Sequence, residues 1–149
     1  LSEYGLRTVG IDLSPEMIGL ARAAHPGVTY EVGDMLALPA GDGEWFGLVA
    51  MYSIVHFDDS QLSVAAGEFA RVLRPGAPAL VAFHGGDEIR HVEDFFGRGV
   101  ELDFRLFDPA AVVAALEGAG LHVEAHLERD AYLEIEAPTR RVYLLCRRT

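Results

Sequence analysis

The chain has 149 residues, half of them hydrophobic, which is enough for one domain around a single buried core. Its formal net charge of −11 opposes nonspecific binding to nucleic-acid phosphates. The chain contains no Lys, so its permanently charged basic residues are all Arg, and it contains no Asn. These absences exclude a phosphate-loop lysine, a Schiff-base lysine and a Cys-His-Asn triad.

Two further features bear on location. No apolar run approaches the roughly 18 residues that suggest a membrane span, so we expect no membrane partner. Cys146 is the single cysteine, which excludes an internal disulfide and fits a reducing compartment. We therefore expect a cytoplasmic protein in which Cys146, within the apolar run 142–146, is a buried core thiol.

The first motif in the chain, over residues 7–22, predicts a short strand that ends in an acid and turns directly into a helix. The apolar run 9–11 stops at Asp12, Ser14 is placed to cap the next helix, and Pro15 suits its first turn. In open α/β sheets ligands bind at the carboxyl ends of strands, where an acid can accept hydrogen bonds from both hydroxyls of a ribose. The alternative is that Asp12 only begins a turn.

The next predicted strand repeats this arrangement. Residues 28–32 form an apolar and β-branched segment that is followed by Gly33-Asp34-Met35 and then by a Pro- and Gly-containing loop. Two successive strands therefore each end in an acid, which favours a ligand site over an isolated turn.

The rest of the chain continues to alternate between strands and helices. We predict strands near 7–12, 28–32, 46–52, 78–84, 121–129 and 140–147, and helices near 15–24, 60–73 and 109–118. Such alternation indicates an α/β fold with a mostly parallel sheet and helices on both faces, closed by an antiparallel C-terminal hairpin. We expect a single domain over 1–149, with a less regular substrate-facing insert at 84–107.

Four segments resemble the class I S-adenosylmethionine-dependent methyltransferases, which have a Rossmann-like fold. They are Val9-Gly-Ile-Asp-Leu-Ser-Pro-Glu-Met17, Gly33-Asp34-Met35, Phe46-Gly-Leu-Val-Ala-Met-Tyr-Ser53 and Ala70-Arg-Val-Leu-Arg-Pro-Gly76. The resemblance implies S-adenosylmethionine as cofactor, with its ribose on Asp12, its adenine beside Asp34 and Met35, and its methionine end facing Tyr52 and Ser53. The implied cofactor-binding residues are Asp12, Leu13, Met17, Asp34, Met35, Tyr52 and Ser53.

The sequence departs from this family at its start. The family's first strand, its Gly-rich loop and most of the following helix would precede Leu1, and residues 1–5 read as the tail of that helix, with Gly5 at its cap. The resemblance thus indicates an N-terminally truncated methyltransferase whose cofactor would not be well ordered on these residues alone. We expect the 149 residues to belong to a longer chain, or another segment or copy to fill the gap.

The candidates for chemistry follow the later strands. His56, four residues after Tyr52, is placed to take a proton from the attacking atom of a methyl acceptor, although a structural role is the alternative. His84 and Arg105 flank the insert and are candidate substrate contacts. The His and carboxylate spacing in this segment matches no established metal site, so we expect none. The acidic charge and short insert favour a small-molecule acceptor, and a homodimer is compatible with them.

Two other classes of function stay open. A nicotinamide-dependent oxidoreductase also places an acid after its second strand. Its Gly-rich motif would precede that strand and so cannot be checked in these residues. The other alternative is a noncatalytic nucleoside-binding protein of the same fold. The Gly33-Asp34-Met35 turn and the segment 70–76 favour the methyltransferase.

Overall fold

A computed structural model describes residues 4–93, 99 and 101–149, and the chain divides into two compact units, Leu1–Ala40 and Gly41–Thr149. Part of the predicted helix tail (residues 1–3) and part of the predicted insert (94–98 and 100) lie outside the described residues. The single domain over 1–149 and the insert boundaries stay predictions.

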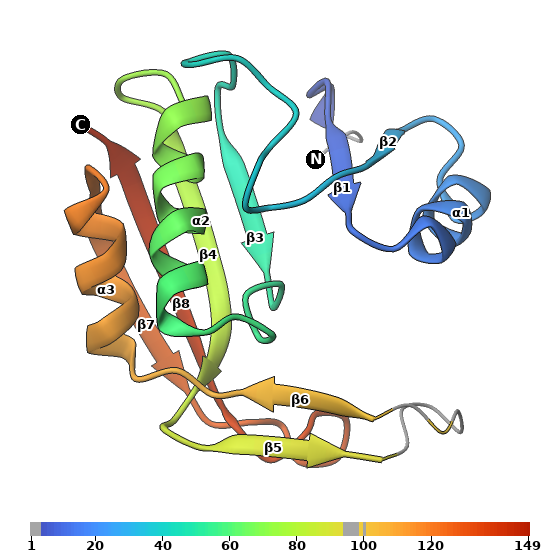
Figure 1. Cartoon of the computed structure of the whole chain (residues 1–149), viewed down its shortest axis with the longest axis vertical. Helices are drawn as coiled ribbons and strands as arrows, with labels where there is room; N and C mark the ends of the chain where they lie inside the picture. Colours follow the sequence, from blue (N-terminus) through green and yellow to red (C-terminus); the bar gives the residue numbers. More distant parts are fainter. Residues whose placement is uncertain (1–3, 94–98, 100) are drawn as a thin grey trace. The chain divides into compact units, whose positions relative to one another are not determined.

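The unit Leu1–Ala40 consists of β1 (Val9–Asp12), α1 (Pro15–Ala24) and β2 (Thr29–Val32) (Figure 1). The two strands run parallel, with Asp12 opposite Val32. Helix α1 begins as predicted, because the Ser14 hydroxyl accepts a hydrogen bond from the backbone N–H of Met17 at 3.2 Å and Pro15 occupies the first turn. Among the described strands, β1 pairs only with β2.

A glycine inside β1 is explained by the aromatic ring opposite it. Gly10 pairs with Tyr30, and a Cβ at Gly10 would lie 2.5 Å from the Tyr30 ring. The ring therefore occupies the space that any larger residue would need, which keeps the two strands in close register up to their carboxyl ends.

The unit Gly41–Thr149 contains a mixed sheet with the order β3-β4-β8-β7. Its strands are β3 (Leu48–Met51), β4 (Pro78–Gly85), β7 (Leu121–Arg129) and β8 (Arg140–Arg148). The pair β3–β4 is parallel, whereas β8 runs antiparallel to both β4 and β7. The α/β class with parallel strands and an antiparallel C-terminal pair is confirmed.

Two helices, α2 (Asp59–Val72) and α3 (Pro109–Gly118), lie on one face of this sheet (Figure 1). On the face that packs against them, six residues of β4 and β8 are at most 1% exposed: Ala79, Val81, Phe83, Val142, Leu144 and Cys146. Cys146 is thus the core thiol that the sequence predicts, and burial raises its pKa to about 11. The opposite face carries the alternate residues, among them His84, Arg141 and Tyr143. Helices on both faces stay a prediction.

Helix α2 has defined signals at both ends. At its start Asp58 and Gln61 form a reciprocal capping box, with N–H to oxygen distances of 2.8 and 3.0 Å. After its end the backbone N–H of Ala77 donates to the Arg74 carbonyl at 2.9 Å, and Gly76 has φ +79°. The Arg-Pro-Gly segment therefore forms a turn that requires a positive φ and leads into β4.

The segment 84–107 is more regular than expected. It contains an antiparallel ribbon of β5 (Ile89–Val92) and β6 (Leu102–Arg105). Each strand has only four residues, which is too short for a clear alternation in the sequence. The N–H of Arg105 also donates to the Val55 carbonyl at 2.7 Å, so β6 holds the loop that follows β3.

None of the helices described is both long and apolar enough to cross a membrane.

Candidate functional site

The two predicted acids lie at the carboxyl ends of neighbouring parallel strands. Asp12 ends β1, Asp34 follows β2 by two residues, and the Gly33 N–H donates to the Asp12 carbonyl at 3.0 Å. Both side chains make the same local contact: Oδ1 of Asp12 accepts from the Ser14 N–H, and Oδ1 of Asp34 accepts from the Leu36 N–H, each at 2.8 Å. Each acid therefore stabilises its own turn. Each also lies at the carboxyl end of a parallel strand, the edge where open α/β sheets bind ligands.

These acids have the chemistry that a nucleoside requires. Both are exposed, and each turn engages one carboxylate oxygen, so a second oxygen remains to accept hydrogen bonds from hydroxyl or amino groups. Apolar side chains lie close in sequence: Leu13 is 70% exposed, Met17 is 54% exposed and Met35 is half-buried. An acceptor pair flanked by accessible apolar side chains fits the ribose and adenine of S-adenosylmethionine.

The loop after β3 holds three predicted residues: Tyr52, Ser53 and His56. Tyr52 has φ +53° and is the one non-glycine residue with positive φ among those described, whereas Ser53 is half-buried. Such a conformation costs a bulky residue energy, and such residues concentrate at functional sites. The Tyr52 N–H donates to the Ala82 carbonyl at 2.8 Å, which fixes the residue against β4.

His56 is oriented by the ribbon. Its Nδ1 lies 2.8 Å from the Asp103 carbonyl oxygen, and its ring centroid is 5.1 Å from that of Phe104. Because a carbonyl only accepts, Nδ1 carries the proton, and in the neutral ring Nε2 keeps a lone pair. The ring is therefore held in the tautomer that a general base needs.

The two candidate substrate residues have different surroundings. His84, near the end of β4, lies against Tyr52, with ring centroids 4.8 Å apart. The guanidinium of Arg105 instead donates to Asp59 at 2.7 Å and lies 5.0 Å from the centre of the Phe107 ring. The structure thus brings Tyr52 and His84 together, while Arg105 fastens the ribbon to the start of α2.

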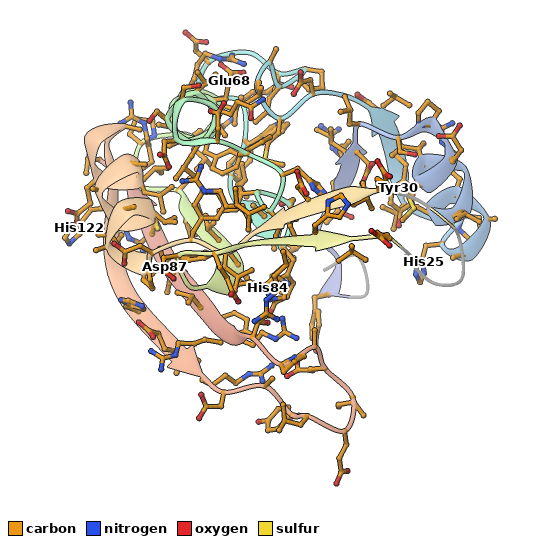
Figure 2. All side chains as sticks on the ribbon, turned by 60° about the horizontal axis from the view of Figure 1, so that its bottom comes forward. His25, Tyr30, Glu68, His84, Asp87 and His122 are labelled. Carbon is orange, nitrogen blue, oxygen red and sulfur yellow. The ribbon has the colours of Figure 1, made fainter. Side chains whose placement is uncertain are left out.

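Sequence reasoning missed a group of side chains around Tyr52 and His84. Across three adjacent strands, His84 of β4 pairs with Arg141 of β8, which pairs with Arg129 of β7. Tyr143, on the same face of β8 as Arg141, shares a hydrogen bond of 2.8 Å with the Tyr52 hydroxyl. Figure 2 shows His84 beside nitrogen-bearing side chains, and Arg141 is in hydrogen-bond contact with the His84 ring.

Neighbouring charges and burial hold these groups in fixed protonation states. Burial, and then Arg141 and Arg90, lower the pKa of His84 to about 4, so the ring is neutral at pH 7. Burial and the Tyr143 hydrogen bond raise the pKa of Tyr52 to about 12. The bidentate contact with Arg129 lowers the pKa of Glu136 to about 2, so this carboxyl is ionised. None of these groups titrates near neutral pH.

One sequence signal could have pointed to this group. Arg141 directly precedes the apolar run 142–146, and it shares a face with Tyr143 two residues later. Arg141 is only 6% exposed. Arginines are seldom this buried unless a partner compensates their charge, so such a position indicates a group of interacting side chains.

Among the residues that the structure describes, no group of three or more His, Cys, Asp or Glu side chains could hold a metal ion.

Comparison with known proteins identifies the family. A family described as a methyltransferase domain matches residues 1–76. Demethylmenaquinone methyltransferase of Chlorobaculum parvum is 34% identical over 77 residues, which are 52% of this chain and 31% of that enzyme. Because the family match covers more than half of the chain, the chain belongs to the methyltransferase-domain family.

Solved structures agree on the fold. A S-adenosylmethionine-dependent methyltransferase from Methanosarcina mazei superimposes with a TM-score of 0.82 at 16% identity, covering 94% of this chain and 81% of that one. The 1,6-didemethyltoxoflavin-N1-methyltransferase of Burkholderia thailandensis, solved with S-adenosylhomocysteine and its substrate, gives 0.73 at 18% identity, covering 99% and 64%. The predicted Rossmann-like methyltransferase fold is confirmed. The chain spans about a third of the length of the curated relatives it matches.

Proposed function

We propose that the protein transfers the methyl group of S-adenosylmethionine to a small-molecule acceptor. The observation that carries this proposal is the pair of acids, Asp12 and Asp34, at the carboxyl ends of adjacent parallel strands in a chain of the methyltransferase-domain family. The family match favours methyl transfer over the nicotinamide-dependent oxidoreductase alternative.

Each predicted residue has a proposed role toward the cofactor. Asp12 accepts hydrogen bonds from the ribose hydroxyls, with Leu13 and Met17 beside it. Asp34 accepts from the adenine amino group, and Met35 contacts the ring. Tyr52 and Ser53, in the loop after β3, face the methionine portion.

When bound, S-adenosylmethionine supplies a sulfonium methyl group that a lone pair of the acceptor can attack. His56 is the proposed general base, because its Nδ1 proton is directed to the Asp103 carbonyl and its Nε2 can take the proton that the attacking atom loses. The new bond to the methyl carbon forms as the carbon–sulfur bond breaks, and S-adenosylhomocysteine leaves.

Two observations support a small acceptor. The net charge of −11 disfavours nucleic acid, and the relative from Chlorobaculum parvum is named for a small molecule, demethylmenaquinone. Binding to DNA or RNA that weakens steeply with added salt would contradict this part of the proposal.

Calorimetric titration of the full chain tests the cofactor. We expect S-adenosylhomocysteine and S-adenosylmethionine to bind and NAD not to bind. Binding of NAD in place of the two adenosyl compounds would overturn the proposal, whereas cofactor binding without transfer to phenols, amines or carboxylic acids would favour the noncatalytic alternative.

His56 is tested by comparison with His91, a histidine of the β5–β6 ribbon that contacts it. His56→Ala should lower turnover by roughly 10²–10⁴-fold, the usual contribution of a general base, while leaving cofactor affinity nearly unchanged. His91→Ala is the matched control, because His91 contacts the same residue, Asp103, at 2.7 Å through its side chain. Equal loss of turnover and cofactor affinity in His56→Ala would assign His56 a structural role.

A further inference from the structure

The side chains around Tyr52 form a group whose charges are not balanced. This group, which we name the arginine–tyrosine cluster, consists of Tyr52, His84, Arg129, Glu136, Arg141 and Tyr143. All six belong to the unit Gly41–Thr149, and five of them come from β4, β8, β7 and the loop between β7 and β8.

Two guanidinium groups share one carboxylate within this cluster. Arg129 and Arg141 face each other directly across β7 and β8, a placement that like charges disfavour. Glu136 accepts two hydrogen bonds from Arg129, both at 2.7 Å, but its oxygen is 3.7 Å from Nε of Arg141. Since His84 and both tyrosines are neutral, the six residues together carry a charge of about +1 at pH 7.

Arg141 is the less well compensated of the two arginines. It is 6% exposed, and its Nε is buried with no hydrogen-bond partner among the described residues. Its terminal nitrogens instead bond to neutral groups: the Thr139 hydroxyl at 3.0 Å, the Ala137 carbonyl at 3.3 Å and the His84 ring. A buried cation on neutral partners is costly unless an anion lies close by.

The tyrosine pair holds one hydroxyl proton that no contact uses. Nη2 of Arg129 donates to the Tyr143 oxygen at 3.1 Å, and the hydroxyl oxygens of Tyr143 and Tyr52 are 2.8 Å apart. Two hydroxyl groups that share one hydrogen bond leave one O–H to donate elsewhere. No acceptor for that proton occurs within the described part of the chain.

His84 belongs to the same group of side chains. The Thr139 hydroxyl lies 2.8 Å from its Nδ1, and Nη1 of Arg141 contacts Nδ1 and lies 3.3 Å from Nε2. These contacts do not fix which ring nitrogen carries the proton of the neutral ring. His84 is therefore a neutral partner of Arg141 and brings no negative charge to the cluster.

We propose that the arginine–tyrosine cluster binds a carboxylate of the methyl acceptor, held by the free hydroxyl proton of the tyrosine pair and attracted by the positive charge that Arg129 and Arg141 carry in excess of Glu136. This inference rests on the proposed function, since it specifies the acceptor of the same reaction. A carboxylate matches the cluster because it can accept the free hydroxyl proton and brings the single negative charge that the cluster lacks.

The location of the cluster ties it to methyl transfer. The ring of Tyr52 lies 5.4 Å from the guanidinium carbon of Arg141 and 4.8 Å from the His84 ring centroid, and Tyr52 is the residue proposed to face the methionine portion of the cofactor. A carboxylate on the cluster would therefore fix one end of the acceptor while leaving its nucleophilic group for the methyl.

Benzoate and benzamide are suitable probes because they have almost the same shape and differ in charge. We expect benzoate to bind the full chain in a calorimetric titration, and benzamide to bind at least roughly tenfold more weakly, as the loss of charge-assisted hydrogen bonds implies. The imidazole ¹⁵N resonances of His84 should shift with benzoate, because this ring contacts both Tyr52 and Arg141.

The variants separate the cluster from the rest of the molecule. Arg129→Met removes one of the two positive charges and should weaken benzoate binding at least roughly tenfold without changing the affinity for S-adenosylhomocysteine. Arg141→Met removes the other charge but carries a risk of unfolding, so the second variant is the double change Tyr52→Phe/Tyr143→Phe, which removes both hydroxyls of the pair. Arg140→Met, at an arginine that is 58% exposed on the same strand as Arg141, is the matched control and should bind benzoate as the wild type does.

The outcomes distinguish this inference from the proposed function. Equal affinity for benzoate and benzamide, or unchanged benzoate binding in both Arg129→Met and Tyr52→Phe/Tyr143→Phe, would overturn the carboxylate site even if S-adenosylhomocysteine binds normally. If instead benzoate binding depends on the cluster but no adenosyl compound binds, the carboxylate site stands and methyl transfer fails.

Discussion

The acids after β1 and β2 and the arginine–tyrosine cluster are both candidate binding groups, but their contacts span very different stretches of chain. Asp12 and Asp34 each bond to a backbone N–H two residues away. In the cluster, Tyr52 and Tyr143 are 91 positions apart, and His84 and Arg141 are 57 apart. The acids are thus formed by local turns, whereas the cluster exists only once the sheet has assembled.

The two regions also differ in charge and exposure. Asp12 and Asp34 are exposed and negative, so water compensates them until a hydroxyl or amino group replaces it. The cluster is half-buried or buried, carries excess positive charge, and has little access to water. The comparison predicts that changes at the acids affect ligand affinity, whereas changes in the cluster affect the stability of the fold as well.

The largest effect is expected for Arg141→Met. The change leaves the buried Thr139 hydroxyl and the Ala137 carbonyl without their guanidinium donor, and it removes the cation facing Glu136. Each polar group left without its donor costs about 1–3 kcal/mol, and the loss of a poorly compensated buried charge offsets part of this cost, so the free energy of unfolding measured with urea should fall by about 2–4 kcal/mol.

The neighbouring arginine provides the control for that measurement. Arg140 pairs with Glu128 at 3.0 Å, but its side chain is 58% exposed. Arg140→Met should therefore change the free energy of unfolding by only about 0–1 kcal/mol. Similar losses in the two variants would mean that burial does not distinguish the cluster from the surface.

A smaller effect, on binding and not on folding, is expected at Asp12. Asp12→Ala should lower the affinity for S-adenosylhomocysteine by about 1.5–3 kcal/mol, because two hydrogen bonds to an ionised acceptor are lost. Asp12→Asn separates the two roles of this residue, since the amide oxygen can still accept from the Ser14 N–H and preserve the turn. We expect Asp12→Asn to lose affinity too. Unchanged calorimetric affinity in both variants would show that Asp12 stabilises the turn and does not bind the ribose.

The contrast explains how much the sequence could predict. The strand at residues 121–129 and the helices at 15–24 and 109–118 have the predicted bounds, because capping residues and hydrophobic runs are local signals. The Asp12 turn follows from the same local logic. The methyltransferase fold was predictable because short motifs such as Gly33-Asp34-Met35 combine a strand end with a specific side chain.

The cluster could not be predicted in the same way. The pairing of His84 with Arg141 depends on strand order and register, which the sequence around either residue does not specify. The ribbon of β5 and β6 was missed for a related reason, because each four-residue strand is defined mainly by its partner. The tautomer of His56 likewise follows from a long-range partner, the carbonyl of Asp103.

A double-mutant cycle tests whether the long-range tyrosine contact is energetically real. Tyr52→Phe and Tyr143→Phe each remove one hydroxyl of the 2.8 Å pair, and we expect a coupling free energy of about 0.5–1.5 kcal/mol in urea unfolding. The residues are far apart in sequence, so coupling can arise only through the folded cluster. Additive effects of the two substitutions would show that this contact does not contribute to stability.

The last effect concerns the pH dependence of stability at His84. Its pKa is lowered from 6.5 to about 4 in the folded state, mainly by burial and then by Arg141, so between these values the unfolded chain binds more protons than the folded one. Stability that depends on neutral His84 is therefore fully present above pH 6.5 and is lost as the pH falls toward 4. Thermal unfolding of the wild type and of His84→Gln between pH 7 and 4.5 measures this contribution. The difference between their melting temperatures should change by roughly a few degrees over this range, because only the wild type loses stability through protonation of His84. Parallel curves over this range would mean that His84 is protonated as readily in the fold as outside it, and that Arg141 does not control its charge.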